Sequence, residues 1–263
     1  LVATARVSQA KRLFVAGRLA EGWQAYEARH DLTYEDATVF PLPYPQWQAG
    51  TSIEGRHLLL IGEQGLGDEV LFAQTVADVL SALGPKGRLT LALDPRLQTL
   101  AARAFPAAQI VAHTTGRANG RGLRGIETAF VKDKAPDLWA PFGTAMAALR
   151  PDAASFGAGA PFLIPDPVRV AHWKAWLATL KVGDKVALAC DSGWSRRTYK
   201  VLEISRMTAT QAVCFNDGRF RLKDGFVIGG GYSQVEPVTE RVLQAMEADS
   251  LRAWFSSTSR KSL

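Results

Sequence analysis

The stretch His57-Leu-Leu-Leu-Ile-Gly-Glu-Gln-Gly-Leu-Gly-Asp68 decides the fold of the first part of this chain. Residues 57–61 form a short, continuous apolar run, which is typical of a strand buried on both faces of a parallel sheet. A glycine-rich turn follows, and a helix is predicted over about residues 68–83. A buried strand that turns directly into a helix is the first unit of a parallel, doubly wound α/β sheet.

The same alternation continues along the chain. Residues 88–93 predict a second strand, and Asp94 and Pro95 supply an N-cap and a first helical position for the helix after it. Residues 109–112 and 137–140 predict a third and a fourth strand. We therefore expect one α/β domain over residues 54–180, with its sites beyond the carboxyl ends of the strands.

The segments around this domain have other patterns. Residues 1–35 predict a helical hairpin broken at Gly17, either the second half of a tetratricopeptide-like repeat or an ordinary helical pair. Residues 36–53 are rich in proline and predict a linker on a surface. Residues 113–126 lack a hydrophobic period and predict a mobile surface loop, whose arginines either contact an anionic ligand or are simply solvated.

The region after residue 180 changes character. Strand-like runs are separated by the turn signals Asp217-Gly218 and Asp224-Gly225, and a helix is predicted over about residues 238–255. Residues 181–263 are therefore expected to form a small antiparallel β-barrel with a terminal helix. Residues 181–235 carry nine Lys and Arg against five Asp and Glu. The difference of four positive charges is most of the net charge of +6 of the whole chain.

Composition excludes several classes of protein. With 263 residues, 47% of them hydrophobic and 21% charged, the chain is neither disordered, collagen-like nor a disulfide-rich miniprotein. Cys190 and Cys214 have no CxxC or Cys/His neighbour, so no metal site and no redox pair are expected. No apolar stretch approaches the roughly 20 residues that span a bilayer, and no signal peptide is recognisable. A cytoplasmic location is therefore expected, and Leu1 in place of Met predicts a preceding segment.

The glycine-rich turn differs from a dinucleotide-binding fingerprint. Gly65 and Gly67 match its first two glycines, but Val70 stands in place of the third. Asp68 and Glu69 would repel a phosphate bound at the start of the helix. A carboxylate at the mouth of the sheet is better suited to a general base that accepts a proton from an alcohol.

Residues 18–180 resemble the N-terminal half of bacterial heptosyltransferase-like glycosyltransferases with upstream tetratricopeptide repeats, in which this domain is the first Rossmann-like half of a GT-B fold. The matching stretches are Glu21-Gly-Trp-Gln-Ala-Tyr-Glu-Ala-Arg, Pro45-Gln-Trp-Gln-Ala-Gly, Gly55-Arg-His-Leu-Leu-Leu, Glu63-Gln-Gly-Leu-Gly-Asp-Glu-Val-Leu-Phe-Ala and Asp137-Leu-Trp-Ala-Pro-Phe-Gly. The resemblance implies that Asp68 deprotonates the acceptor hydroxyl. We expect Glu63, Gln64, Gly65 and Gly67 to bind the acceptor. The alternative for Asp68 is a helix-start acid without a catalytic role.

The resemblance ends near Leu180, because nothing after it offers the second Rossmann-like domain that holds the nucleotide-sugar in such enzymes. The implied reaction is transfer of a sugar from a nucleotide-sugar to an acceptor hydroxyl, without a cofactor or metal. Proximity of donor and acceptor supplies much of the rate, so the chain by itself is expected to be a poor or inactive transferase.

The C-terminal module is similar to small β-barrel proteins of bacteriophages. The stretches that carry this resemblance are Val182-Gly-Asp-Lys-Val, Trp194-Ser-Arg-Arg-Thr-Tyr and Phe220-Arg-Leu-Lys-Asp-Gly. Basic residues beside aromatic ones suit contacts with single-stranded nucleic acid. The candidate contacts are Trp194, Arg196, Arg197, Lys200, Arg219, Arg221 and Lys223. The alternatives are a solvated face or a non-catalytic module that binds a protein partner. The sequence specifies no oligomeric state.

Overall fold

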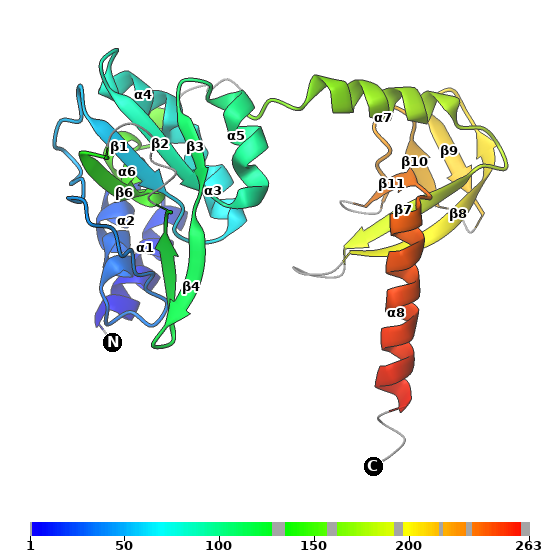
Figure 1. The fold of residues 1–263 in the computed structure, drawn as a ribbon, viewed down its shortest axis with the longest axis horizontal. Coiled ribbons are helices and arrows are strands. Elements are labelled where there is room, and N and C mark those ends of the chain that lie inside the picture. Colours follow the sequence, from blue (N-terminus) through cyan, green and yellow to red (C-terminus); the bar gives the residue numbers. More distant parts are fainter. Residues whose placement is uncertain are drawn as a thin grey trace. The chain divides into compact units, whose positions relative to one another are not determined.

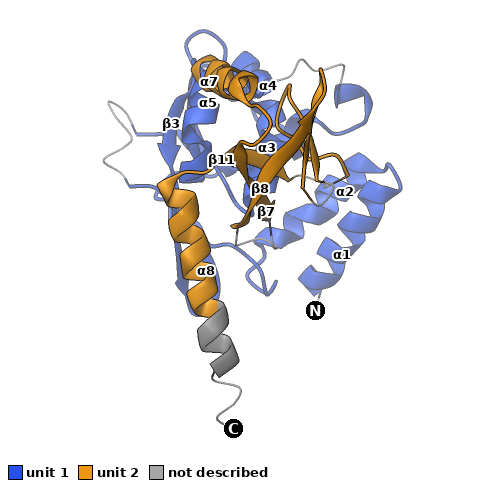
Figure 2. Ribbon diagram, turned by 90° about the vertical axis from the view of Figure 1, so that its right-hand side faces the viewer, with its two compact units in different colours: residues 1–164 blue, residues 165–263 orange. Residues whose placement is uncertain are grey.

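The computed structural model describes residues 2–127, 135–156, 162–191, 197–215, 218–229 and 233–258. The chain divides into two compact units, Leu1–Ile164 and Pro165–Leu263 (Figure 2). This division differs from the expected boundary at residues 180/181. The reason is helix α7 (Pro167–Thr179), whose Leu177 is buried in the core of the second unit.

The first unit is built on a parallel sheet, as expected from the alternation of strands and helices (Figure 1). Its strands are β1 (His57–Ile61), β2 (Arg88–Leu93), β3 (Gln109–Ala112) and β6 (Leu138–Pro141). Their order is β3-β2-β1-β6, and every neighbouring pair is parallel. All five residues of β1 are buried, which confirms that its apolar run is a central strand.

Short helices connect and cover these strands. They are α3 (Leu66–Phe72), α4 (Val76–Leu83), α5 (Gln98–Ala104) and α6 (Phe142–Leu149), with the 3₁₀ turns η2 (Ala73–Thr75), η3 (Pro95–Leu97) and η5 (Ala154–Phe156). The helix expected over residues 68–83 is therefore interrupted by η2. Asp94 is the N-cap of η3, where its Oδ1 accepts a hydrogen bond of 2.9 Å from the Arg96 N–H.

The helical hairpin is confirmed, and it forms part of the first unit. It consists of α1 (Val2–Val15), α2 (Leu19–Tyr26) and the 3₁₀ turn η1 (Glu27–His30). Gly17 breaks the helix with a φ of +73°, a conformation that favours glycine. Trp23 belongs to the main hydrophobic core, and its ring centroid lies 6.5 Å from that of Phe72.

Residues 36–53 lie on the surface of the first unit, as expected, with more than half of them exposed, but they are anchored in this unit and do not link two domains. Trp47 and Ile53 are buried. The backbone N–H of Trp47 donates to the backbone carbonyl of Trp139 at 2.7 Å, and the backbone N–H of Trp139 donates to the Pro45 carbonyl at 3.0 Å. The segment thus pairs with β6 at the edge of the sheet, where backbone groups would otherwise lack partners.

The loop expected over residues 113–126 is a β-hairpin. Its strands are β4 (Thr114–Ala118) and β5 (Arg121–Gly125), joined by Asn119 and Gly120 with φ of +51° and +78°. Asn-Gly with two positive φ values is the preferred two-residue hairpin turn, so turn chemistry formed this element without a hydrophobic period.

The second unit is an antiparallel sheet curled into a half-barrel. It contains β7 (Lys185–Asp191), β8 (Arg197–Met207), β9 (Gln211–Cys214), β10 (Arg219–Arg221) and β11 (Gln234–Pro237). Their order is β10-β9-β8-β7-β11, and Phe226 and Val227 form bridges to the two edge strands. The expected terminal helix is α8 (Glu240–Thr258) (Figure 1). Its Val242 packs against residues of β7 and β8.

Candidate functional site

A pocket of about 320 Å³ lies in the first unit, where β1 ends. From β1 the chain continues to β2 on one side of the sheet, whereas β6 pairs with the opposite edge of β1. The strand order therefore reverses at β1, which makes its carboxyl end a topological switch point. Ligands of open α/β sheets bind beyond the carboxyl ends of the strands at such switch points. We call this the switch-point pocket. Its lining consists of Val7, Lys11, Tyr26, Arg29, His30, Tyr34, Asp36, Thr38, Glu63 and Gln64.

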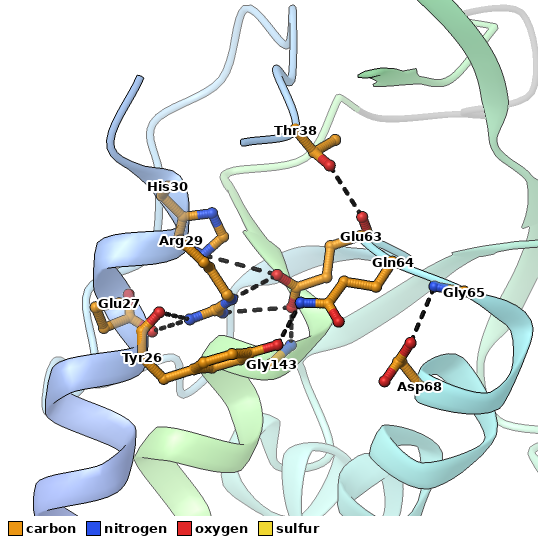
Figure 3. A network of polar contacts seen from close by, with 10 residues as sticks. All are labelled: Tyr26, Glu27, Arg29, His30, Thr38, Glu63, Gln64, Gly65, Asp68 and Gly143. Carbon is orange, nitrogen blue, oxygen red and sulfur yellow. Dashed lines mark hydrogen bonds and ion pairs between the residues drawn. The ribbon is translucent and has the colours of Figure 1, made fainter. Parts of the chain in front are cut away.

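A buried ion pair between Arg29 and Glu63 forms the floor of this site (Figure 3). Arg29 Nε and Nη2 donate to the two carboxylate oxygens of Glu63 at 2.7 and 3.3 Å, and each side chain is only 3% exposed. Glu63 Oε1 also accepts from the Gly143 N–H in the first turn of α6. Arg29 Nη1 donates to Glu27 Oε1 at 2.8 Å. A fork of guanidinium donors facing a carboxylate holds both groups in one geometry.

Gly143 is required by this pairing. A Cβ atom added there would lie 2.5 Å from Glu63 Oε1 and 2.8 Å from Arg29 Nη2, which is closer than real contacts allow. The ion pair therefore sits against bare backbone, and the end of β6 is held to the end of β1 through Glu63.

The burial of these groups shifts their pKa values. Burial opposes the charge of Arg29, but the carboxylates of Glu63 and Glu27 outweigh it and raise its pKa further. Burial, together with the nearby Arg29, lowers the pKa of His30 to about 4. Burial and Glu63 raise the pKa of Tyr26 to about 12. At neutral pH the pocket thus presents a neutral imidazole and a protonated phenol as uncharged hydrogen-bonding groups.

Gln64 and Asp68 extend the site along the glycine-rich turn. Gln64 Nε2 donates to the Tyr26 hydroxyl, and the Gln64 carbonyl accepts from Arg124 Nη2 at 2.7 Å. Asp68 is half-buried in the first turn of α3, where its Oδ2 accepts from the Gly65 N–H at 3.0 Å. The predicted residues Glu63 and Gln64 therefore line the pocket, whereas Asp68 caps the next turn of chain beside it (Figure 3).

Steric contacts do not require glycine at either of the two positions that were expected to shape the acceptor site. A Cβ atom on Gly67 would meet nothing within 4 Å, and one on Gly65 would meet only Asp68 Oδ2 at 3.4 Å. The sterically required glycine of the turn is Gly62, where a Cβ atom would collide with the carboxylate of Glu69.

Glu69 and His113 form a second buried pair that sequence reasoning missed. Glu69 Oε1 lies 2.8 Å from His113 Nε2, and Glu69 Oε2 accepts from the Asp94 N–H at 2.8 Å. Glu69, Asp94 and His113 follow β1, β2 and β3. Their contacts therefore hold the carboxyl ends of these three strands together. Both partners are buried, and neither lines the switch-point pocket.

Arg29, Tyr26, His30 and Gly143 were also missed as site residues. A signal for two of them was present, because the matching stretches that begin at Glu21 and Asp137 end at Arg29 and Gly143. The structure brings those ends together at Glu63.

The basic residues of the second unit do not share one face of its sheet. Trp194 and Arg196 lie outside the described residues. Strand alternation puts Arg197 on the same face as Tyr199, and Lys200 on the opposite face. Arg219 and Arg221 flank the buried Phe220 and so face away from the core, and Lys223 is exposed.

Arg221 is also occupied within the second unit, because its Nη2 lies 2.8 Å from Asp224 Oδ2. Nucleic-acid binding by this unit therefore remains a prediction.

Among the residues that the structure describes, no group of three His, Cys, Asp or Glu side chains is placed to hold a metal ion. None of the helices described is long and apolar enough to cross a membrane.

No protein-family model matches this chain, and no solved structure matches it. The chain is similar to the protein FlbA of Caulobacter vibrioides, with 42% identity over 187 residues. The match covers 71% of this chain and 31% of FlbA, so the chain spans less than a third of the length of this curated relative.

Proposed function

We propose that the first unit binds a hydroxyl-bearing acceptor at the switch-point pocket and supports glycosyl transfer to it, with Asp68 as the general base. The observation that carries this proposal is the position of the Asp68 carboxylate, half-buried in the turn after β1 and next to a polar pocket at the switch point. The resemblance to glycosyltransferases around residues 63–73 supports the same assignment.

The lining of the pocket suits a polyhydroxylated ligand. Tyr26, His30 and Gln64 are uncharged at neutral pH and offer hydrogen-bond donors and acceptors. The charge of Arg29 is compensated by Glu63 and Glu27. Lys11 and Asp36 also line the pocket, at exposed positions and with opposite charges. The uncharged groups of the lining suit sugar hydroxyls.

Asp68 is the acid of the turn whose carboxylate accepts the fewest hydrogen bonds from the described residues. Both oxygens of Glu63 and both oxygens of Glu69 accept hydrogen bonds from neighbouring groups. Among the described residues, the carboxylate of Asp68 has one hydrogen bond, from the Gly65 N–H to Oδ2. Its Oδ1 is therefore the acceptor best placed for a ligand hydroxyl.

In the proposed reaction, the acceptor oxygen forms a bond to the anomeric carbon of the nucleotide-sugar while the bond from that carbon to the diphosphate breaks. The hydroxyl proton passes to Asp68, and the nucleoside diphosphate leaves with the electron pair. The described strands of the second unit are antiparallel, which does not suit a doubly wound nucleotide site. The donor would therefore be held by another chain or by a part outside these residues.

The experiment has two stages. The ¹⁵N-labelled chain is first titrated with methyl glycosides, and we expect the amide resonances of Gln64, Gly65 and Asp68 to shift. Nucleoside diphosphate release is then measured with UDP-glucose, UDP-N-acetylglucosamine and GDP-mannose, with and without the acceptor. Slow, acceptor-dependent release should fall by about 10²-fold or more in Asp68→Asn.

The matched control is Asp166→Asn, because Asp166 is also a helix-start acid, whose Oδ1 caps α7 through the Val168 and Arg169 N–H groups. Release should be unchanged in this variant. Equal release by Asp68→Asn and the wild-type chain would show that Asp68 is only a capping acid. Absence of release by the wild-type chain with every donor would contradict transfer by this chain alone, and absence of shifts at Gln64 to Asp68 would contradict acceptor binding and with it the role of Asp68.

A further inference from the structure

A second pocket of the first unit, of about 360 Å³, lies between α2, residues 46–49 and α6. We call it the α2–α6 pocket. One wall is formed by Ala20, Trp23 and Gln24 of α2 together with Glu27, the first residue of η1, and these four follow the spacing of one helical face. It shares no lining residue with the switch-point pocket, so it is a separate site.

The polar groups of this pocket are mostly amides. Gln24, Gln46 and Gln48 are exposed and line it, and each amide offers two N–H donors and a carbonyl acceptor. An apolar helix of a partner protein would leave these amides unpaired. The pocket thus suits a ligand that carries many hydroxyl groups.

The pocket carries no uncompensated charge. Glu27 is the single charged residue among its lining residues, and its carboxylate accepts from Arg29 Nη1 at 2.8 Å. The ligand that fits is therefore uncharged.

The aromatic residues add carbon surface. The indole N–H of Trp23 donates to the Arg150 carbonyl at 3.1 Å, and that of Trp47 donates to the Thr51 carbonyl at 3.0 Å. Both polar atoms are thus occupied, and the rings contribute apolar contacts. Aromatic carbon beside amide groups matches a sugar ring, which has apolar C–H faces and hydroxyl groups at its rim.

Thr144 provides an independent observation. The residue is 3% exposed, and its Oγ1 is buried without a hydrogen-bond partner in the described part of the chain. Buried hydroxyls are nearly always hydrogen-bonded, and Thr144 is one of the residues that line this polar pocket, so its unpaired hydroxyl is a candidate partner for a ligand group.

We propose that the α2–α6 pocket binds an uncharged saccharide, with Gln24, Gln48 and Thr144 as its hydrogen-bonding residues. This site does not depend on the reaction proposed above, because it uses other residues.

The test is a titration of the ¹⁵N-labelled chain with three neutral oligosaccharides: maltotriose, cellotriose and triacetylchitotriose. We expect at least one of them to shift the amide resonances of Gln24, Gln48 and Thr144. Thr144→Val keeps the shape of the side chain and removes the hydroxyl, so binding should weaken roughly two- to tenfold. Gln24→Ala, at an exposed position where folding is not at risk, should weaken it to a similar degree.

The matched control is Thr75→Val, because Thr75 is a buried threonine of the same unit that lines neither pocket and donates to the Phe72 carbonyl. It should leave the affinity unchanged. Absence of shifts with all three oligosaccharides would overturn the proposal. Shifts confined to Gln64 and Asp68 would also overturn it while supporting acceptor binding at the switch-point pocket. Equal shifts with inorganic phosphate, or shifts that follow protein concentration alone, would replace the saccharide by an anion or by a second copy of the chain.

Discussion

The two units of this chain differ in whether they bury polar and charged side chains. Every buried polar or charged residue of the described regions belongs to the first unit. They are Arg29, His57, Glu63, Glu69, Thr75, Thr90, His113 and Thr144. In the second unit, the ion pairs of the described residues are at least partly exposed, as in Arg221–Asp224, Arg241–Glu236 and Arg252–Asp249.

This difference follows from topology. In a parallel sheet the carboxyl ends of all strands meet at one edge, so residues far apart in sequence converge there and are enclosed by the helices. The core of the half-barrel is filled from neighbouring strands by apolar side chains such as Val186, Ile204 and Phe220. The two buried ion pairs of the first unit, Arg29–Glu63 and Glu69–His113, lie at this edge, where the parallel strands end.

Breaking the Arg29–Glu63 pair should have the largest effect. Arg29→Ala leaves Glu63 buried without its partner and should lower the free energy of unfolding of the first unit by about 3–5 kcal/mol. Arg221→Ala removes an exposed pair of the second unit and should cost about 1 kcal/mol or less. Urea unfolding followed by tryptophan fluorescence measures both, and equal losses would show that the two units do not differ in this respect.

Adding a methyl group tests how closely the first unit is packed at its site. Gly143→Ala should lower the free energy of unfolding by about 1–3 kcal/mol, because the new atom collides with the ion pair. Gly67→Ala has open space around it in α3 and should be neutral or stabilising by up to about 1 kcal/mol. A Gly143→Ala variant as stable as the wild type would contradict the close approach of Glu63 to α6.

The pH dependence of stability should differ between the units through His30. Its pKa is about 4 when folded, against an ordinary value of 6.5, so between these values the unfolded state binds a proton that the folded state does not. The free energy of unfolding of the first unit should therefore fall as pH falls through this window, by at most about 1.4 kcal/mol per pH unit. His30→Gln should flatten this part of the curve, and an unchanged curve would contradict the burial of a neutral His30.

The smallest effect concerns two basic residues of the second unit, Arg219 and Lys223. If Arg219 and Lys223 contact phosphates, the chain should bind a single-stranded oligonucleotide weakly, with affinity falling about sevenfold between about 50 and about 200 mM salt. The double variant Arg219→Ala, Lys223→Ala should reduce both the affinity and its salt dependence in a mobility-shift titration. No retardation at the lower salt concentration would leave the second unit without a nucleic-acid role.

Several elements could be predicted because their signals are local. The apolar run of β1, the break at Gly17 and the alternation around β2 each lie within a few neighbouring residues. The β4–β5 hairpin is not predicted by hydrophobic period, because its strands have none, and its local signal is the turn at Asn119-Gly120.

The sequence by itself determined that a buried parallel strand leads into a glycine-rich turn bearing Glu63, Gln64 and Asp68, and that an antiparallel region follows residue 180. Only the tertiary structure decided what surrounds those side chains. Arg29 and Gly143 lie 34 and 80 residues from Glu63 along the chain, and they meet it because the hairpin and α6 pack at the same edge of the sheet. Periodicity and turn propensity depend on neighbouring residues, whereas the partner of a buried charge depends on which distant segments fill the space beside it.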